Sequence, residues 1–143
     1  MAASRKKLTL PPRLLKPSEF RRIGRRGKRF RLDFLVMVLS RSGQNGGRLG
    51  ITISEKAVKH STRRNRLRRM LKESIRLWWN EVKPGWDILF IINRFPDIDH
   101  MWHVESVVLQ LFINSGILTG DGLTGAQNRI VEIPAEIKFK TDA

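Results

Sequence analysis

The hydrophobic pattern of the chain predicts a β-hairpin in its first half. From residue 30 to residue 38 every second residue is apolar, a period of two that is typical of a half-buried strand. The same alternation returns at residues 49–53, after a Ser-, Gly- and Asn-containing stretch at residues 42–47 that favours a turn. We therefore predict an antiparallel hairpin over residues 30–54.

Three helices and one further strand are predicted around this hairpin. Apolar residues spaced three to four apart, with capping and terminating residues at their ends, predict helices over residues 18–26, 62–80 and 100–115. Their predicted N-caps are Ser18, Thr62 and Asp99, and glycines at 27 and 116 would end the first and the last. A nearly continuous apolar run at residues 86–93 predicts a central strand covered on both faces.

The order helix, hairpin, helix, strand, helix predicts an α+β fold, a two-layer sandwich with a mainly antiparallel sheet. A chain of 143 residues suffices for one domain with a single core. We expect residues 1–12 to form a basic flexible arm and residues 13–118 to form the domain. Residues 119–143 are expected to be a C-terminal tail, and the sequence does not indicate its role.

Positive charge is concentrated in the first half of the chain. Residues 1–76 carry 23 basic and 4 acidic side chains, a net charge of +19, whereas residues 77–143 carry a net charge of −4. The whole chain has a formal charge of +15 and an isoelectric point near 11.5. This imbalance indicates a polyanionic partner, and the apolar residues between the charges favour a folded binding surface over a solvated charge run.

Composition excludes several other classes of protein. The chain has no cysteine, which rules out disulfides, thiol catalysis and cysteine-type zinc sites. Its apolar runs, Ile88 to Ile92 among them, are far shorter than the roughly 20 residues that cross a bilayer, and no signal-peptide core follows the basic N-terminus. We expect a cytoplasmic protein without membrane contact.

Few residues suggest catalysis by the protein itself. His100 and His103 have the spacing of metal ligands on a helix turn, with Asp97, Asp99 or Glu105 as further ligands, but surface or helix-cap histidines are commoner. Asp97 and Asp99 could chelate Mg²⁺ in a nuclease. Acids in a proline-flanked loop before a helix are more often turn and cap residues.

The predicted helix over residues 62–80 is amphipathic. Leu67, Leu71 and Ile75 share its apolar side. The opposite side carries a stripe at i, i+4, i+7 and i+11, made of Asn65, Arg69, Lys72 and Arg76. We therefore predict a cationic outer face on this helix.

This helix also carries a family signature. Residues 64–73 read RNRLRRMLKE and resemble the R-N-R-x-[KR]-R-x-x-[RK]-E signature of the bacterial ribonuclease P protein component. Residues 14–20 are similar to the opening helix of that family, and residues 48–54 to its strand before the signature. Residues 85–94 are similar to its G-x-D strand ending in Arg, so the resemblance covers about residues 13–116.

The resemblance implies the protein subunit of a ribonucleoprotein hydrolase, an RNA-catalysed endonuclease that removes the 5′ leader in tRNA processing. In that family the RNA subunit carries the active site and its Mg²⁺, so we expect no catalytic residue and no bound metal on the protein. The implied partners are the RNase P RNA and precursor tRNA, with no obligate protein partner. The family also implies a left-handed strand-helix-strand crossover, against the usual right-handed rule.

The resemblance further implies two groups of site residues. RNA contacts are expected from Lys56, Arg64, Asn65, Arg66, Arg68, Arg69, Lys72 and Arg76. Arg64 lies nearer the apolar side of the helix and has the alternative role of bracing the helix start. The leader is expected in a cleft with Phe20, Phe34 and Arg21, where the rings could stack on unpaired bases. Core packing is the alternative for both phenylalanines.

Three departures from the family pattern bear on these roles. Gly24 stands where a second aromatic residue is frequent, Met37 where a strand tyrosine is common, and Glu55 in place of a usual basic residue. These departures predict fewer aromatic rings for stacking on the leader and one contact fewer with an RNA phosphate. The alternatives in other functional classes are a ribosomal or general RNA-binding protein and a protein-only Mg²⁺ nuclease that uses Asp97 or Asp99.

Overall fold

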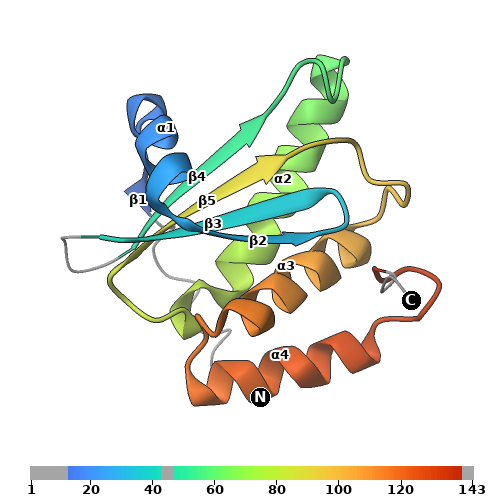
Figure 1. Cartoon of the computed structure of the whole chain (residues 1–143). Coiled ribbons are helices and arrows are strands. Elements are labelled where there is room, and N and C mark those ends of the chain that lie inside the picture. The colour runs from blue at the N-terminus through green and yellow to red at the C-terminus, as the bar shows by residue number, and fades with distance from the viewer. Residues whose placement is uncertain (1–12, 43–46, 140–143) are drawn as a thin grey trace.

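The computed structural model describes residues 13–42 and 47–139, so the expected arm at residues 1–12 lies outside the described residues (Figure 1). A five-stranded mixed sheet lies at the centre, in the spatial order β1-β4-β5-β3-β2. The strands are β1 (Arg13–Leu14), β2 (Lys28–Leu32), β3 (Leu35–Arg41), β4 (Arg48–Ile53) and β5 (Trp86–Ile92). The helices are α1 (Pro17–Arg26), α2 (Ser61–Trp78), the short 3-10 helix η2 (Trp79–Glu81), α3 (Met101–Ser115) and α4 (Gly120–Glu132). The α+β class is confirmed.

The predicted hairpin over residues 30–54 is wrong in its pairing. The chain turns at Asp33, whose φ is 55°, and β2 and β3 on either side of this turn form the hairpin. β4 pairs with β5, which is parallel to it and lies between β4 and β3. Residues 34–39 are all apolar, so the sequence pattern could not show where one strand ends and the next begins. The sheet is therefore mixed, with two parallel and two antiparallel pairings.

β5 is a central strand covered on both faces, as predicted. Its residues Ile88 and Phe90 belong to the larger core beneath α2 and α3, whereas Leu89 packs with Ile23 of α1 on the other face. Figure 1 shows α1 on one side of the sheet and α2 and α3 on the other. The two-layer description thus holds for the sheet with α2 and α3, and α1 adds a helix to the second face.

The unit β4-α2-β5 joins two neighbouring parallel strands through a helix. This is the strand-helix-strand connection that the family resemblance implies. Its left-handedness stays a prediction.

The helix caps differ from the predicted ones by one or two residues. The observed N-caps are Lys16, His60 and His100. His100 Nδ1 accepts a hydrogen bond from the backbone N–H of Trp102 (3.0 Å), so His100 has the capping role that was predicted for Asp99. Gly116 ends α3 in the left-handed conformation (φ 73°), where glycine is favoured.

Helix α4 was not predicted and lies in the segment expected to be a tail. Glycines at positions 120, 122 and 125 lower its helix propensity, which is why the pattern failed here. In the fold, the absence of side chains at Gly122 and Gly125 lets α4 approach Glu81 and Trp78 closely. Close packing of α4 against Glu81 and Trp78 therefore outweighs the low helix propensity of its glycines.

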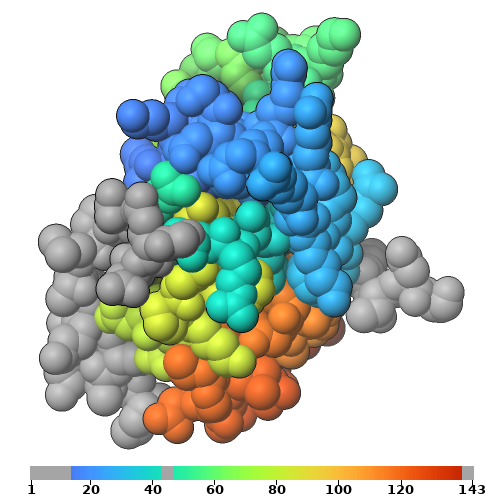
Figure 2. Space-filling model, turned by 60° about the vertical axis from the view of Figure 1, so that its left-hand side comes forward, coloured from blue at the N-terminus to red at the C-terminus, as the bar shows by residue number. Residues whose placement is uncertain are grey.

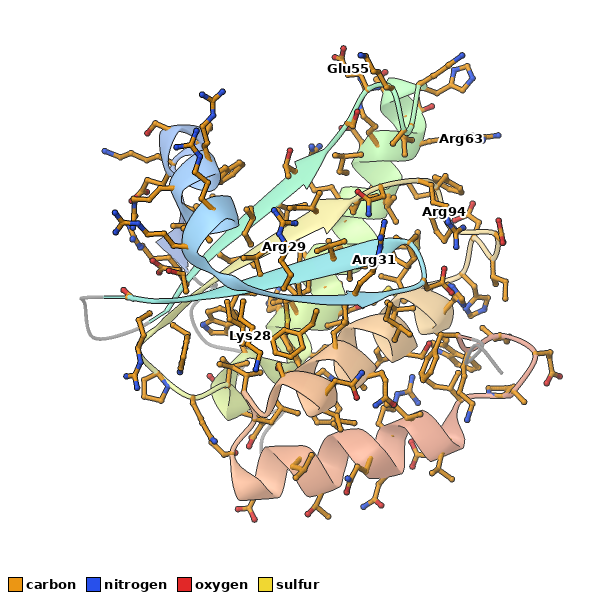
Figure 3. The ribbon with its side chains drawn as sticks, viewed as in Figure 1. Lys28, Arg29, Arg31, Glu55, Arg63 and Arg94 are labelled. Atoms are coloured by element: carbon orange, nitrogen blue, oxygen red, sulfur yellow. The ribbon has the colours of Figure 1, made fainter. Side chains whose placement is uncertain are left out.

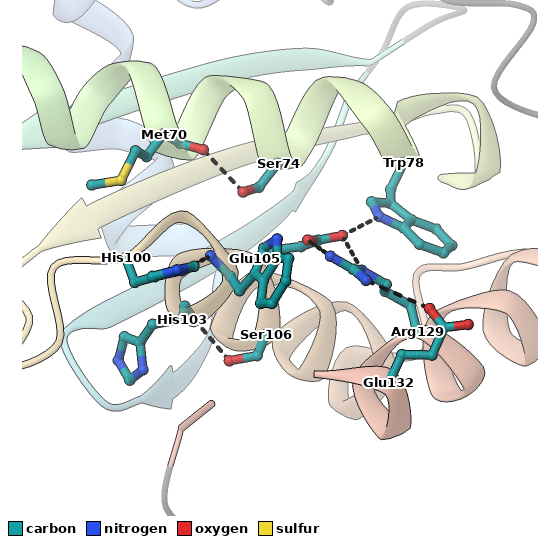
Figure 4. A network of polar contacts seen from close by, with 10 residues as sticks. Met70, Ser74, Trp78, His100, His103, Glu105, Ser106, Arg129 and Glu132 are labelled. Carbon is teal, nitrogen blue, oxygen red and sulfur yellow. Dashed lines mark hydrogen bonds and ion pairs between the residues drawn. The ribbon is translucent and has the colours of Figure 1, made fainter. Parts of the chain in front are cut away.

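A buried ion pair joins α4 to α3 (Figure 4). Arg129 donates from Nε and Nη2 to the two carboxylate oxygens of Glu105 (3.1 and 2.9 Å), and Trp78 Nε1 lies 3.4 Å from the same carboxylate. Glu105 is only 4% exposed, and its carboxylate raises the pKa of Arg129. The pair is bidentate and therefore fixes α4 in both position and orientation.

We predict that Arg129→Ala lowers the free energy of unfolding by about 2 to 4 kcal/mol, because it leaves the carboxylate of Glu105 buried without its partner. Urea denaturation followed by circular dichroism measures this change. Glu132→Gln is the control, since the Glu132 carboxylate contacts Arg129 at 3.5 Å but is largely exposed. Equal stabilities of Arg129→Ala and the parent protein would contradict a structural role for the pair.

Candidate nucleic-acid interface

Arg48 fixes α1 against the sheet. From β4 it donates through Nε and Nη2 to the carboxylate of Asp87 on β5 (3.1 and 2.8 Å), and through Nη1 to Glu19 of α1 (2.8 Å). Asp87 is 1% exposed, and its hydrogen bond raises the pKa of Arg48. The acidic residue of the G-x-D pattern therefore has a structural role as the partner of Arg48.

Glu19 also caps the helix in which it lies. Its carboxylate accepts the backbone N–H of Lys16 (3.0 Å), and this bond, followed by the contact with Arg48, lowers the pKa of Glu19 below its ordinary value of 4.5. The stabilisation is thus complete above the ordinary pKa and is lost as the pH falls through the lowered one. The helix start and its attachment to the sheet depend on one carboxylate.

A cleft of about 370 Å³ opens between α1 and the adjoining sheet face. Its wall contains the half-buried ring of Phe20, and its floor contains Leu89 and Ile91. The remaining lining side chains include three arginines and a threonine, Arg21, Arg25, Arg29 and Thr52. In Figure 2 the blue residues of α1 and the lighter blue residues of β2 lie together on the face turned to the viewer. An apolar floor with an aromatic wall and cationic rim suits an unpaired nucleic-acid strand.

Two of the three residues predicted for this cleft lie in it, Phe20 and Arg21. Phe34 does not line it, and its predicted place in the cleft is wrong. Its side chain is fully buried in the core beneath the sheet, where its ring stacks on His103 at 6.2 Å. Core packing, the alternative interpretation, is the correct one for Phe34.

Met37, one of the three departures from the family pattern, lies on the face of the sheet opposite α1. Met37 is fully buried in the core with α2 and α3. Its neighbours Val36 and Val38 are the residues of β3 that face α1. The side chains of β3 on the face toward α1 are therefore aliphatic rather than aromatic.

At Gly24 an arginine occupies the space of the missing aromatic ring. Arg29 donates from Nη2 to the carbonyl of Gly24 (3.1 Å), and a Cβ at position 24 would contact only this guanidinium. A planar guanidinium can stack on a base as an aromatic ring does. Arg29 was not among the predicted site residues, although it precedes the apolar Phe30 in β2 and must therefore lie on the opposite face of the strand.

The predicted cationic stripe is present on α2. Its members are all exposed: Asn65, Arg69, Lys72 and Arg76. The N-terminus of α2 adds to this surface. His60 makes no side-chain capping bond and the first turn has no acidic residue, so no negative charge of that turn offsets the positive end of the helix dipole. This end of the helix, beside Arg63, is therefore favourable for a phosphate.

Other predicted RNA-contact residues are engaged within the protein. Arg64 donates to the carbonyls of Val58 and Lys59 (2.8 and 2.9 Å) and braces the helix start, as its position on the wheel suggested. Arg66 pairs with Asp99 (3.0 Å), although both side chains stay about half exposed. Arg68 makes only a long hydrogen bond to Asn65 Oδ1 (3.5 Å), and Lys56 is exposed after the end of β4.

The acidic and histidine residues considered for catalysis are also engaged. Asp97 pairs with Arg94 (3.4 Å), Asp99 pairs with Arg66, and His100 caps α3. Within residues 13–42 and 47–139, no three histidine or carboxylate side chains come together as a metal site. In the same ranges, no helix has both the length and the apolarity needed to cross a membrane.

Comparison with known proteins assigns this geometry to a family. The family model described as Ribonuclease P matches residues 9–102, which is more than half of the chain. The chain belongs to the ribonuclease P protein family. The "Ribonuclease P protein component" of Clostridium botulinum is 36% identical over 106 residues, which are 73% of this chain and 95% of that relative.

Solved structures agree with the assignment. The RNase P protein from Thermotoga maritima is 29% identical, with a TM-score of 0.61 over 69% of this chain and 93% of that one. The Staphylococcus aureus RNase P protein has a TM-score of 0.67 over 75% of this chain and 97% of that one, and at 19% identity it shows the fold alone. Helix α4 lies beyond the ribonuclease P family match, which ends at residue 102.

We predict that Arg48→Ala lowers the free energy of unfolding by about 2 to 4 kcal/mol, because Asp87 then remains buried without a counter-ion. It should also loosen α1, which hydrogen exchange of the α1 amides would detect. Arg22→Ala is the matched control, because Arg22 also contacts Glu19 (3.5 Å) but is half exposed and does not reach the sheet. Similar losses in the two variants would show that Asp87 does not depend on Arg48.

Proposed function

We propose that this chain, as a ribonuclease P protein, contacts two RNAs through two surfaces. The exposed stripe of α2 binds phosphates of the RNase P RNA, and the cleft beside α1 binds the single-stranded 5′ leader of precursor tRNA. The observation that carries the proposal is the cleft itself, in which the ring of Phe20 and three arginines surround an apolar floor.

The family supplies the activity. The chain is the protein subunit of an endoribonuclease holoenzyme that acts in tRNA processing, and the RNA subunit carries out the catalysis. A general RNA-binding role is not favoured, because the family match includes the signature helix and the strands on both sides of it. The protein therefore contributes binding energy and orientation.

The Mg²⁺ of the reaction is held by the RNA subunit in this proposal. The protein lowers the concentration of Mg²⁺ that is needed, because its cations offset repulsion between the phosphates of the two RNAs. The proposed location of the holoenzyme is the cytoplasm, in keeping with a chain that has no cysteine.

Reconstitution tests the proposed function. Precursor tRNA, an RNase P RNA and Mg²⁺ are incubated with and without the protein, and release of the leader is followed over a range of Mg²⁺ concentrations. The protein should lower the Mg²⁺ requirement and should cleave nothing without the RNA. Cleavage by the protein alone, or no effect of the protein on the RNA-catalysed reaction, would contradict the proposal.

We predict that Arg69→Ala weakens binding of the RNase P RNA and reduces the slope of log K against log salt by about 0.7 to 0.9, the contribution of one phosphate. The melting temperature should change little, because Arg69 is exposed on the side of α2 away from the core. Filter binding at several salt concentrations gives the slope.

Lys83→Ala is the matched control for this experiment. Lys83 is an exposed cation whose backbone N–H donates to Ile117 beyond the end of α3, away from the stripe. The Lys83→Ala substitution removes one positive charge, as Arg69→Ala does, but it removes no proposed RNA contact. Its slope of log K against log salt should therefore equal that of the parent protein. Equal slopes for Arg69→Ala and the parent protein would make Arg69 a solvated surface residue.

We predict that Phe20→Leu weakens holoenzyme binding of precursor tRNA by about tenfold and leaves binding of mature tRNA unchanged, since only the former has a leader to stack on the ring. Leucine keeps most of the apolar volume, so the loss of stability should be modest.

Phe30→Leu serves as the control, because Phe30 is a partly buried phenylalanine that packs against the core on the other face of the sheet. It should affect both substrates equally or not at all. If Phe20→Leu reduces the affinity for leader-bearing and leaderless tRNA by the same factor, Phe20 is a packing residue.

A further inference from the structure

A second hollow, of about 570 Å³, opens beside the end of the β2-β3 hairpin. The turn between these strands forms one wall, and the segment between β5 and α3 forms the other. The side chains that matter for its chemistry are Arg31, Asp33, Arg94, Asp97 and His103. None of them was a predicted RNA-contact residue.

The wall of this hollow contains an unusual backbone and an unpaired buried nitrogen. Asp33 has a φ of 55°, a left-handed conformation that is costly for a residue with a side chain. His103 is 3% exposed, and its Nδ1 donates to the carbonyl of Ile137 (2.7 Å). Its Nε2 has no hydrogen bond, although Asp33 Oδ2 lies 3.3 Å away. Such features at one place point to a site that binds something.

The two arginines of the hollow differ in their partners. Arg94 is shared between the carboxylates of Asp33 (3.0 Å) and Asp97 (3.4 Å). The side chain of Arg31 is exposed and has no hydrogen bond or ion pair with any described residue. A free guanidinium beside one that is held by carboxylates is a suitable receptor for a phosphate.

The hollow and the cleft beside α1 are each lined by an arginine of β2, Arg31 in the hollow and Arg29 in the cleft. Arg29 and Arg31 pair in register with Val38 and Val36, the two residues of β3 that face α1. They therefore point to the same side of β2, about 7 Å apart along the strand. Figure 3 shows both arginines on this side of the sheet, with Arg94 next along the same direction. The spacing is close to that of successive phosphates in an extended single strand.

We propose that the hollow beside the β2-β3 turn is a second RNA subsite, in which Arg31 and Arg94 bind a phosphate of a leader that extends beyond the cleft. The proposal rests on the proposed leader binding. The strand passes from Arg29 at the rim of the cleft to Arg31, and a longer leader is needed to reach the second position.

Asp33 makes the release of Arg94 possible. When Arg94 turns toward the phosphate, the carboxylate of Asp33 loses one partner, while its Oδ2 stays 3.3 Å from Nε2 of His103, with which it forms an ion pair when the imidazole is protonated. Asp97 competes with the phosphate in the same way, but it is 91% exposed and water replaces its lost contact. Asp33 and Asp97 are thus positioning residues for Arg94.

The test measures the affinity of reconstituted holoenzyme for precursor tRNAs whose leaders increase in length, and for mature tRNA. As the leader is lengthened, the loss of affinity caused by Arg29→Ala should reach its full size first. Arg31→Ala should weaken binding by about three- to tenfold, and only for leaders longer than that length. Lys83→Ala controls for the loss of one positive charge. Circular dichroism confirms that each variant is folded.

The opposite change is expected from Asp97→Asn. It removes a competitor of the phosphate, so long-leader precursor tRNA should bind about two- to threefold more tightly, a gain that misfolding cannot produce. Asp121→Asn on α4 is its control, because it removes an exposed negative charge far from the hollow.

Three results would overturn the second subsite: an unchanged affinity of Arg31→Ala for every leader, an equal loss for mature tRNA, or a loss that begins at the same leader length as that of Arg29→Ala. A weaker or unchanged affinity of Asp97→Asn would overturn the exchange at Arg94. If the parent holoenzyme itself does not distinguish leader-bearing from mature tRNA, the leader cleft of the proposed function fails as well. If it does, only the second subsite fails.

Discussion

Arg48 holds three separate parts of the chain together, because its backbone belongs to β4 while its guanidinium contacts β5 and α1. The buried carboxylate of Asp87 requires this cation, and Glu19 accepts a hydrogen bond from its third nitrogen, Nη1. The position of α1 on the sheet, and with it the width of the cleft beside Phe20, follows from this network. An RNA-contact surface of exposed arginines needs such a support, since the cations repel one another and add little to stability.

Two acidic residues of the second half supply counter-charges for the first. Asp87 pairs with Arg48, and Asp99 pairs with Arg66. The first of these pairs is buried and structural, whereas the second is about half exposed and can open. Helix α4 is held in a similar way, because the ion pair of Glu105 and Arg129 joins it to α3. The distribution of charge along the sequence thus corresponds to a division between the proposed RNA contacts and internal support.

The sequence predicted most strongly those elements whose apolar pattern has one interpretation. The continuous run of β5 and the one-sided pattern of α2 are of this kind, and both elements lie where they were expected. Residues 34–39 are apolar on both sides of the strand, so neither the turn at Asp33 nor the burial of Phe34 could be predicted. Helix α4 depends on glycines that pack against Trp78 and Glu81, contacts that exist only in the fold. In the cleft, Arg29 could have been found from the alternation in β2, but its proximity to Gly24 could not.

The central claim is that two surfaces of one small protein contact two different RNAs, and site-specific crosslinking tests it most directly. Because the chain has no cysteine, Arg25→Cys in the cleft and Arg69→Cys on α2 each provide a unique thiol for a photoreactive group. In the holoenzyme with precursor tRNA, the probe at position 25 should crosslink to the leader, and the probe at position 69 to the RNase P RNA. Crosslinks from both positions to the same RNA, or from position 25 to mature tRNA as efficiently as to precursor, would contradict the account.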